Sequence, residues 1–96
     1  MKLRFLPAAR EELEAAALYL DERAPGLGTD VVGDVERIGE LICEFPQIGR
    51  SLDSVHRSIP LQRFSFSLAY RISANEVIIV AVAHIRRRPG YWRLRK

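Results

Sequence analysis

The C-terminal stretch AVAHIRRRPGYWRLRK, residues 81–96, contains the side chains best suited to chemistry. Histidine, arginine and tyrosine together can cleave RNA, because one group activates the ribose 2′-hydroxyl, one stabilises the pentacoordinate charge and one protonates the leaving oxygen. If a strand ends near His84, side-chain alternation places His84 and Arg86 on the same face. The candidate catalytic residues, if the protein is a nuclease, are therefore His84, Arg86 and Tyr91.

The same stretch also suits binding without catalysis. Arginines grip phosphates while aromatic rings stack on bases, a combination typical of sites for single-stranded nucleic acid. Arginine-rich segments equally bind acidic proteins, and a histidine that satisfies the end of a strand is a common structural residue. We expect a target-binding surface formed by Arg86, Arg87, Arg88, Tyr91, Trp92 and Arg93. The alternative is that the two aromatic residues pack the segment back over the sheet.

Charge is distributed unevenly along the 96 residues. Residues 1–48 contain ten acidic and five basic side chains, a net charge of −5, whereas residues 49–96 contain two acidic and ten basic ones, a net charge of +8. Together they give the formal net charge of +3. Thirteen of the fifteen basic residues are arginine, which favours bidentate contacts with carboxylate or phosphate. This asymmetry predicts a surface for an acidic or polyanionic partner.

Several classes of function lack the residues that they need. His56, His84 and the single cysteine, Cys43, show no metal-ligand spacing, and no phosphate-binding glycine motif is present, so we expect neither a metal nor a cofactor. One cysteine cannot form an intramolecular disulfide, which is typical of a cytoplasmic protein. We expect no signal peptide and no membrane span, because the longest apolar run, VIIVAVA, is too short to cross a bilayer.

Apolar periodicity predicts two helices that position these residues. The first covers about residues 8–23, begins at Pro7 and stops before Pro25 and Gly26. In the second, apolar residues from Leu27 to Phe45 step by 4, 4, 3, 4 and 3 positions along one face. Because a short Pro-Gly loop joins them, the two helices are expected to form an antiparallel hairpin.

The remaining segments predict strands. Residues 2–5 alternate, residues 63–73 (RFSFSLAYRIS) alternate strictly, and residues 77–84 are apolar on both faces, as an interior strand is. Residues 56–62 supply one more strand, which Pro60 confines to an edge or a bulge. The order β-α-α-β-β-β predicts a single α+β domain over residues 1–96: an antiparallel sheet, a helical hairpin on one face, and a basic tail at residues 85–96. Arg57, Arg63 and an exposed Arg71 are expected to extend the basic surface over the sheet, either as a binding site or only as a charged face that aids solubility.

With this layout, four segments resemble the RelE/ParE superfamily of bacterial toxins from type II toxin–antitoxin modules. They are LRFLPAAREELEAAALYL, ICEFPQIGRSL, FSFSLAYRI and VIIVAVAHIRRRPGYWRLR. The last is the most specific, a strand followed by His-x-Arg-Arg-x-Pro-x-Tyr-Trp, and it is more similar to the ParE branch than to the RelE branch. The resemblance spans nearly the whole chain and implies a RelE/ParE-like fold.

The resemblance also implies a growth-inhibiting toxin of the stress response, neutralised in a hetero-oligomer by a cognate, ParD-like antitoxin. ParE-type toxins stall DNA gyrase without hydrolytic chemistry, whereas RelE-type toxins cut mRNA on the ribosome. Tyr91 matches the family's tail aromatic, Arg86 the arginine that closes the last strand, and His84 a histidine of several members. The lysine-rich second-strand region of ribosome-dependent members is replaced here by His56, Arg57 and Arg63, which weakens the nuclease interpretation.

We therefore expect an inhibitor of DNA gyrase that acts by protein–protein contact and is not an enzyme. The alternatives are a ribosome-dependent mRNA endonuclease and a non-toxic remnant that only binds its antitoxin. Antitoxins of this class present a disordered segment that folds around the toxin, burying apolar residues and pairing acids with arginines. The expected antitoxin-binding residues are Leu13, Leu20, Arg57, Arg63 and Arg71, although both leucines also fit an ordinary core.

Overall fold

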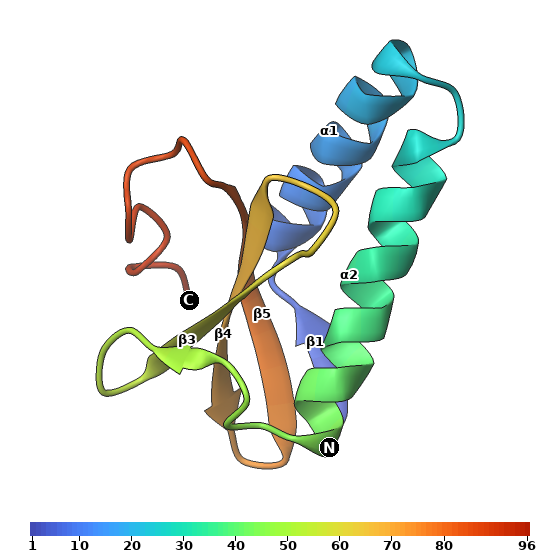
Figure 1. Ribbon diagram of the computed structural model, residues 1–96. Coiled ribbons are helices and arrows are strands. Elements are labelled where there is room, and N and C mark those ends of the chain that lie inside the picture. The colour runs from blue at the N-terminus through green and yellow to red at the C-terminus, as the bar shows by residue number, and fades with distance from the viewer.

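The protein folds as two helices followed by most of a five-stranded sheet. The structure is a computed structural model that describes residues 1–96. The elements are β1 (Lys2–Phe5), α1 (Pro7–Arg23), α2 (Leu27–Glu44), β2 (Arg50–Ser51), β3 (His56–Pro60), β4 (Phe66–Ser73) and β5 (Glu76–His84). The helices form a hairpin on one side of the sheet, and the C-terminal residues lie on the other side (Figure 1). The predicted α+β class is confirmed.

Both helices begin and end close to the predicted positions. Pro7 stands in the first turn of α1, where its missing N–H costs no hydrogen bond. The apolar stripe of α2 is buried at Val31, Val35, Ile38 and Ile42. The carboxylate of Asp21 in α1 accepts hydrogen bonds from the N–H groups of Gly26 (3.1 Å) and Gly28 (2.8 Å), and so caps the start of α2. Neither helix combines the length and apolar composition that a membrane span requires.

The sheet has the strand order β1-β5-β4-β3-β2, and one of its pairings corrects the prediction. The pairings β2–β3, β3–β4 and β4–β5 are antiparallel, but β1 pairs with β5 in parallel, with Lys2 opposite Glu76 and Phe5 opposite Ile79. The sheet is therefore mixed, not wholly antiparallel. Alternation in a sequence predicts a strand without its direction, and β1 has no hairpin turn that would orient it. The two-residue strand β2 was not predicted, because it is too short to show a period.

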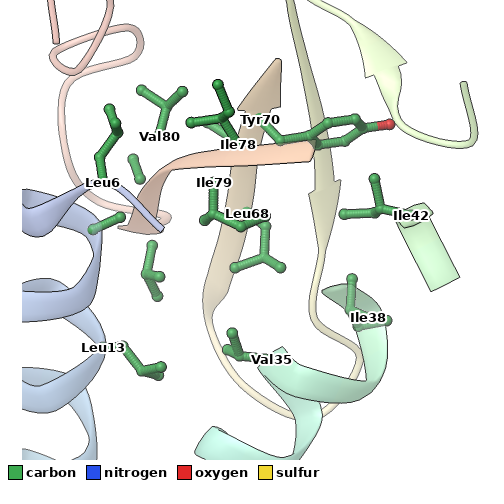
Figure 2. Close-up of a cluster of buried hydrophobic side chains, with 14 of the residues drawn as sticks. Leu6, Leu13, Val35, Ile38, Ile42, Leu68, Tyr70, Ile78, Ile79 and Val80 are labelled. Carbon is green, nitrogen blue, oxygen red and sulfur yellow. The ribbon is translucent and has the colours of Figure 1, made fainter. Parts of the chain in front are cut away.

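Strand β5 is the centre of the core. Its residues Val77 to Val82 are all buried. Figure 2 shows Ile79 of β5 and Leu68 of β4 on the side that faces Leu13, Val35 and Ile38 of the helices. Ile78 and Val80 lie on the opposite side of the strand (Figure 2). The prediction that residues 77–84 form an interior strand is thus confirmed for most of its length, and the cover on the second face must come from outside the helices.

A bulge interrupts β5 at its middle. Ala69 of β4 pairs with Ala81, but Tyr70 pairs with Ile79, so Val80 has no partner on β4. An extra residue of this kind bends a strand and reorients its backbone groups. The carbonyl of Val80 instead accepts a hydrogen bond from the guanidinium of Arg95.

The loop after α2 is tied to the sheet by the buried hydroxyl of Tyr70. That hydroxyl donates to the carbonyl of Pro46 (2.7 Å) and accepts from the N–H of Gly49 (2.9 Å). A Cβ atom on Gly49 would lie 2.7 Å from the Tyr70 ring, so this close approach requires glycine. The contact places Arg50, the next residue, at the start of β2.

Candidate functional site

The C-terminal segment, residues 85–96, is folded and not a free tail. It forms successive turns, in which the N–H groups of Arg87, Tyr91, Arg93 and Arg95 donate to the carbonyls three residues before them. Gly90 has a φ of 76°, a backbone conformation that favours glycine. Pro89 and Gly90 therefore turn the chain back toward the sheet, and Figure 1 shows the segment (red) lying beside it.

Trp92 anchors this segment. Its side chain is 4% exposed and belongs to the same apolar cluster as β4 and β5. The ring packs edge-on against His56 of β3, with 4.8 Å between the ring centroids. The segment thus supplies the missing cover for the second face of the sheet. Of the two roles considered for Trp92, target contact and packing, this geometry fits packing.

Glu12 of α1 is the second anchor, and it binds three separate groups. Its carboxylate accepts the hydroxyl of Tyr91 at 2.5 Å, both terminal nitrogens of Arg95 at 2.8 and 3.0 Å, and the N–H of Val82 at 3.1 Å. Arg95 also donates to the carbonyl of Val80 at 3.0 Å. Strand β1 pairs with β5 only as far as Phe5 and Ile79. Further along β5, its open edge is covered by Glu12 and Arg95, which come from the two ends of the protein.

The ionisation of Glu12 follows from these contacts. Burial acts to raise the pKa of Glu12, but hydrogen bonds from Arg95, Tyr91 and Val82 outweigh burial and hold that pKa below its ordinary value of 4.5. The hydrogen bond to Glu12 is also the chief cause of a raised pKa for Arg95. At neutral pH the site is a charged, bidentate arginine–carboxylate pair.

Tyr91 is held in its protonated form. Burial and the hydrogen bond to Glu12 raise the pKa of the Tyr91 phenol from 10.0 to about 12. A general acid or base works best with a pKa near the working pH, so this phenol is poorly matched to proton transfer. In the folded protein its hydroxyl has a structural partner.

This pKa gives a direct test. In an alkaline titration followed by tyrosinate absorbance, we expect Tyr91 to give an ionisation step near pH 12, which Tyr91→Phe removes. Because the folded pKa is raised, the contribution of Tyr91 to stability is present below pH 10 and is lost as the pH rises through 12. Tyr19→Phe is the matched control, since Tyr19 is exposed on α1. A step near pH 12 that survives in Tyr91→Phe would contradict the assignment.

Asp53, in the loop before β3, is the third anchor. It accepts the N–H groups of His56 (2.7 Å) and Val55 (2.8 Å), the Nε of Arg93 (3.0 Å) and the ring Nδ1 of His56 (3.1 Å). The two backbone hydrogen bonds, followed by that of Arg93, hold the pKa of Asp53 well below its usual range. Arg93, expected in the target-binding surface, thus has a carboxylate partner within the chain.

The arginines that remain free lie on one turn. Arg86, Arg87 and Arg88 are exposed, and none of them forms an ion pair within the chain. The guanidinium of Arg87 lies 3.9 Å from the centroid of the Tyr91 ring, which orients it. The predicted target-binding set therefore separates into two groups. Three arginines face solvent, while Tyr91, Trp92 and Arg93 hold the segment in place.

Two hollows flank the segment. The first, of about 310 Å³, lies against α1 and is lined by His84, Arg87 and Tyr91 together with Glu12 and apolar residues. The second, which we call the basic groove, has about 290 Å³ and runs between the segment and β2 to β5; its lining includes Arg50, Arg87, Arg88 and Arg93. Arg50 was absent from the sequence-based candidates, because an isolated arginine in a loop shows no pattern.

The three nuclease candidates are not assembled together. His84 accepts the N–H of Arg86 at its Nδ1 (3.1 Å) and packs edge-on against Phe66, as a structural residue at the end of β5 does. His84 and Tyr91 line the same hollow, but the arginine that joins them there is Arg87, not Arg86. No three His, Cys, Asp or Glu side chains approach one another closely enough to share a metal ion.

The expected antitoxin-binding residues have mixed positions. Leu13 is 3% exposed and packs in the core, so in this fold it cannot contact a partner. Leu20 is partly buried beside a hollow that also includes Arg63, whose guanidinium lies 3.4 Å from Asp30. Arg57 donates to the carbonyls of Gln47 and Gly49. Arg71, predicted to be exposed, is partly buried and donates to the carbonyls of Arg95 and Lys96.

Comparisons with known proteins agree with this architecture. The family model described as "ParE toxin of type II toxin-antitoxin system, parDE" matches residues 3–89. A solved structure described as "Chromosomal ParDE TA system from P. aeruginosa" is similar in fold, with a TM-score of 0.70 and 23% sequence identity. The similarity covers 88% of this chain and 95% of that chain. No curated protein matches the sequence at a significant level.

Proposed function

The chain belongs to the ParE toxin family of type II toxin–antitoxin systems, and from this premise we propose that it arrests growth by binding DNA gyrase. The proposed contact is made by Arg86, Arg87 and Arg88, held in position by the folded C-terminal segment. The toxin acts in the cytoplasm, where gyrase and its DNA are found, and it needs no cofactor for this action.

The observation that carries the proposal is the separation of the C-terminal residues into two groups. The tyrosine hydroxyl that a nuclease would use donates inward to Glu12, with a phenol pKa of about 12. The exposed arginines, in contrast, have no acidic partner in the chain. A folded turn with free guanidinium groups favours recognition of an acidic surface over proton transfer.

A cognate antitoxin is the second proposed partner. The two halves of the chain carry net charges of −5 and +8, which supports pairing of the basic half with acidic residues of an antitoxin segment. The proposed contacts are Leu20, at the margin of its hollow, and the exposed guanidinium of Arg63. Arg57 and Arg71 already donate to carbonyls within the chain, so their contribution to a partner is smaller.

One observation supports a different function. His84, Arg87 and Tyr91 line a single hollow of about 310 Å³, so an mRNA endonuclease that recruits Arg87 in place of Arg86 is the alternative. In that case Tyr91 must leave Glu12 before it transfers a proton. A third possibility is a non-toxic remnant that has kept only antitoxin binding.

The experiment is induction of the toxin alone in a bacterium, with separate pulse-labelling of DNA and of protein. We expect DNA synthesis to stop first while translation continues. Tyr91→Phe should retain this arrest, because the ring that supports Arg87 is kept, whereas an Arg86→Gln, Arg87→Gln, Arg88→Gln triple variant should lose it. Purified toxin should likewise inhibit supercoiling by gyrase, and the triple variant should not.

The control for lost charge is an Arg4→Gln, Arg23→Gln, Arg37→Gln triple variant, which removes three exposed arginines outside the C-terminal segment. We expect this variant to remain toxic. If translation collapses within minutes and Tyr91→Phe abolishes toxicity, the gyrase proposal is wrong and the endonuclease replaces it. If induction of the wild-type chain has no effect on growth, the remnant interpretation is correct.

A further inference from the structure

The basic groove brings together arginines that are far apart in the sequence. Arg50 comes from β2, and Arg87 and Arg88 come from the C-terminal segment. Arg93 also lines the groove, but Asp53 neutralises it at 3.0 Å. The other three have no ion-pair partner, and no Asp or Glu side chain lines the groove. Their positive charges are therefore available together at one place on the surface.

The lining of the groove includes small and hydroxyl side chains from the sheet. Ser58 of β3 and Ser67 of β4 lie there with Ala83 of β5, which pairs with Ser67. Both serines are partly buried, so their hydroxyl groups remain accessible from the groove. Small side chains allow a chain of phosphates and sugars to approach closely, and serine hydroxyls donate to phosphate oxygens.

We propose that the basic groove binds the sugar–phosphate backbone of duplex DNA. Arg50, Arg87 and Arg88 contact phosphate oxygens, and the serine hydroxyls add neutral hydrogen bonds. Guanidinium groups match the geometry of phosphate, and contacts of this kind carry no information about base sequence. The expected binding is therefore weak, independent of sequence and strongly dependent on salt.

The positions of the aromatic residues favour duplex DNA over a single strand as the ligand. Recognition of single-stranded nucleic acid uses exposed rings on which bases stack. Here Trp92 is 4% exposed, and Tyr91 lies beneath Arg87 with its hydroxyl bound to Glu12. These two rings are therefore not free to receive an unpaired base, and the third ring of the groove, that of His84, packs edge-on against Phe66 and accepts the N–H of Arg86. The groove therefore offers contacts to a sugar–phosphate backbone. A duplex presents that backbone on its outside, with its bases already stacked inside.

This inference goes beyond the proposed function and is tested without gyrase. A toxin that binds the gyrase protein needs no affinity for DNA of its own. Arg50 belongs to the groove alone and Arg86 to the gyrase contact alone, whereas Arg87 and Arg88 are shared by the two proposals. A toxin on the enzyme–DNA complex would therefore divide these arginines between the DNA and the protein. Failure of DNA binding would leave the gyrase proposal intact, and failure of gyrase inhibition would leave the groove's affinity for DNA intact.

The test is fluorescence anisotropy of a labelled, mixed-sequence DNA duplex with the purified full chain, repeated at salt concentrations from about 20 to about 200 mM. Each phosphate contact changes the slope of log K against log salt by about −0.9, so three arginines predict a slope of about −2.7. The Arg50→Gln, Arg88→Gln variant should reduce the slope to about −0.9 and weaken binding at every salt concentration. Arg50 and Arg88 are exposed, so the variant should fold normally.

The matched control is Arg23→Gln, Arg37→Gln, which removes the same charge from the helices on the far side of the sheet. It should keep the slope of about −2.7, because net charge alone does not make phosphate contacts. The proposal would be overturned if both double variants lost affinity for the duplex equally, or if the wild-type chain showed no measurable binding to the duplex. Tighter binding to a single-stranded RNA of the same length, or displacement of the duplex by polyglutamate at equal charge, would also overturn it.

Discussion

Replacing Trp92 with alanine is expected to lower the free energy of unfolding by about 3–5 kcal/mol, the range for removal of a large aromatic side chain from a packed core. Trp92 is 4% exposed and lies in the same apolar cluster as the central strands. Its removal uncovers one face of β4 and β5 and leaves the ring of His56 without its neighbour. Urea denaturation of both proteins measures the difference directly.

The same substitution is expected to abolish growth arrest, because Arg86, Arg87 and Arg88 lose the support that positions them. Leu94→Ala is the matched control. Leu94 is in the same segment but is 93% exposed, so its removal should change the free energy of unfolding by no more than about 0.5 kcal/mol. A loss below about 1 kcal/mol for Trp92→Ala would mean that the C-terminal segment adds little to the core.

Replacing Glu12 with glutamine is expected to lower the free energy of unfolding by about 2–3 kcal/mol at neutral pH, the second large effect. Hydrogen bonds to charged groups contribute about 1.5–3 kcal/mol. The Glu12 carboxylate, 18% exposed, pairs with Arg95, and it also binds Tyr91 and Val82. Glutamine keeps the volume but presents an NH₂ group to one of these donors. The guanidinium of Arg95, whose side chain is 22% exposed, is then left without a carboxylate.

The pH dependence of this effect has a definite sign. The folded pKa of Glu12 lies below its ordinary value of 4.5, so the stability that the carboxylate contributes is fully present above pH 4.5. It is lost as the pH falls through the lower, folded pKa. The difference in free energy of unfolding between wild type and Glu12→Gln should therefore shrink in acid and be constant near neutrality.

Glu11→Gln controls for the loss of one acidic charge on α1, because Glu11 is exposed and forms no ion pair. The free energy of unfolding of Glu11→Gln should equal that of wild type at every pH in the same range. If Glu12→Gln is as stable as Glu11→Gln, or if its deficit persists undiminished in acid, the carboxylate does not hold the C-terminal segment. Thermal unfolding from acid to neutral pH distinguishes these outcomes.

Much of the fold was predictable because it depends on residues close together in the chain. Pro7, the stripe from Leu27 to Phe45 and the alternation in β4 predict their elements from neighbours within a turn or two. The apolar character of β5 correctly predicted an interior strand. The parallel pairing of β1 was not predictable, since its partner lies more than seventy residues away and no turn joins the two strands.

The candidate functional site likewise has features that the local sequence predicts and features that depend on residues far apart in the chain. Composition and spacing were enough to identify residues 84–96 as the segment in which basic and aromatic residues gather. Which of these residues remain free depends on contacts that form only in the folded protein. Arg95 meets Glu12 across 83 positions of the chain, and Arg93 meets Asp53 across 40. The interaction of two charges depends on their separation in space and on burial, and no local pattern in a sequence encodes either quantity.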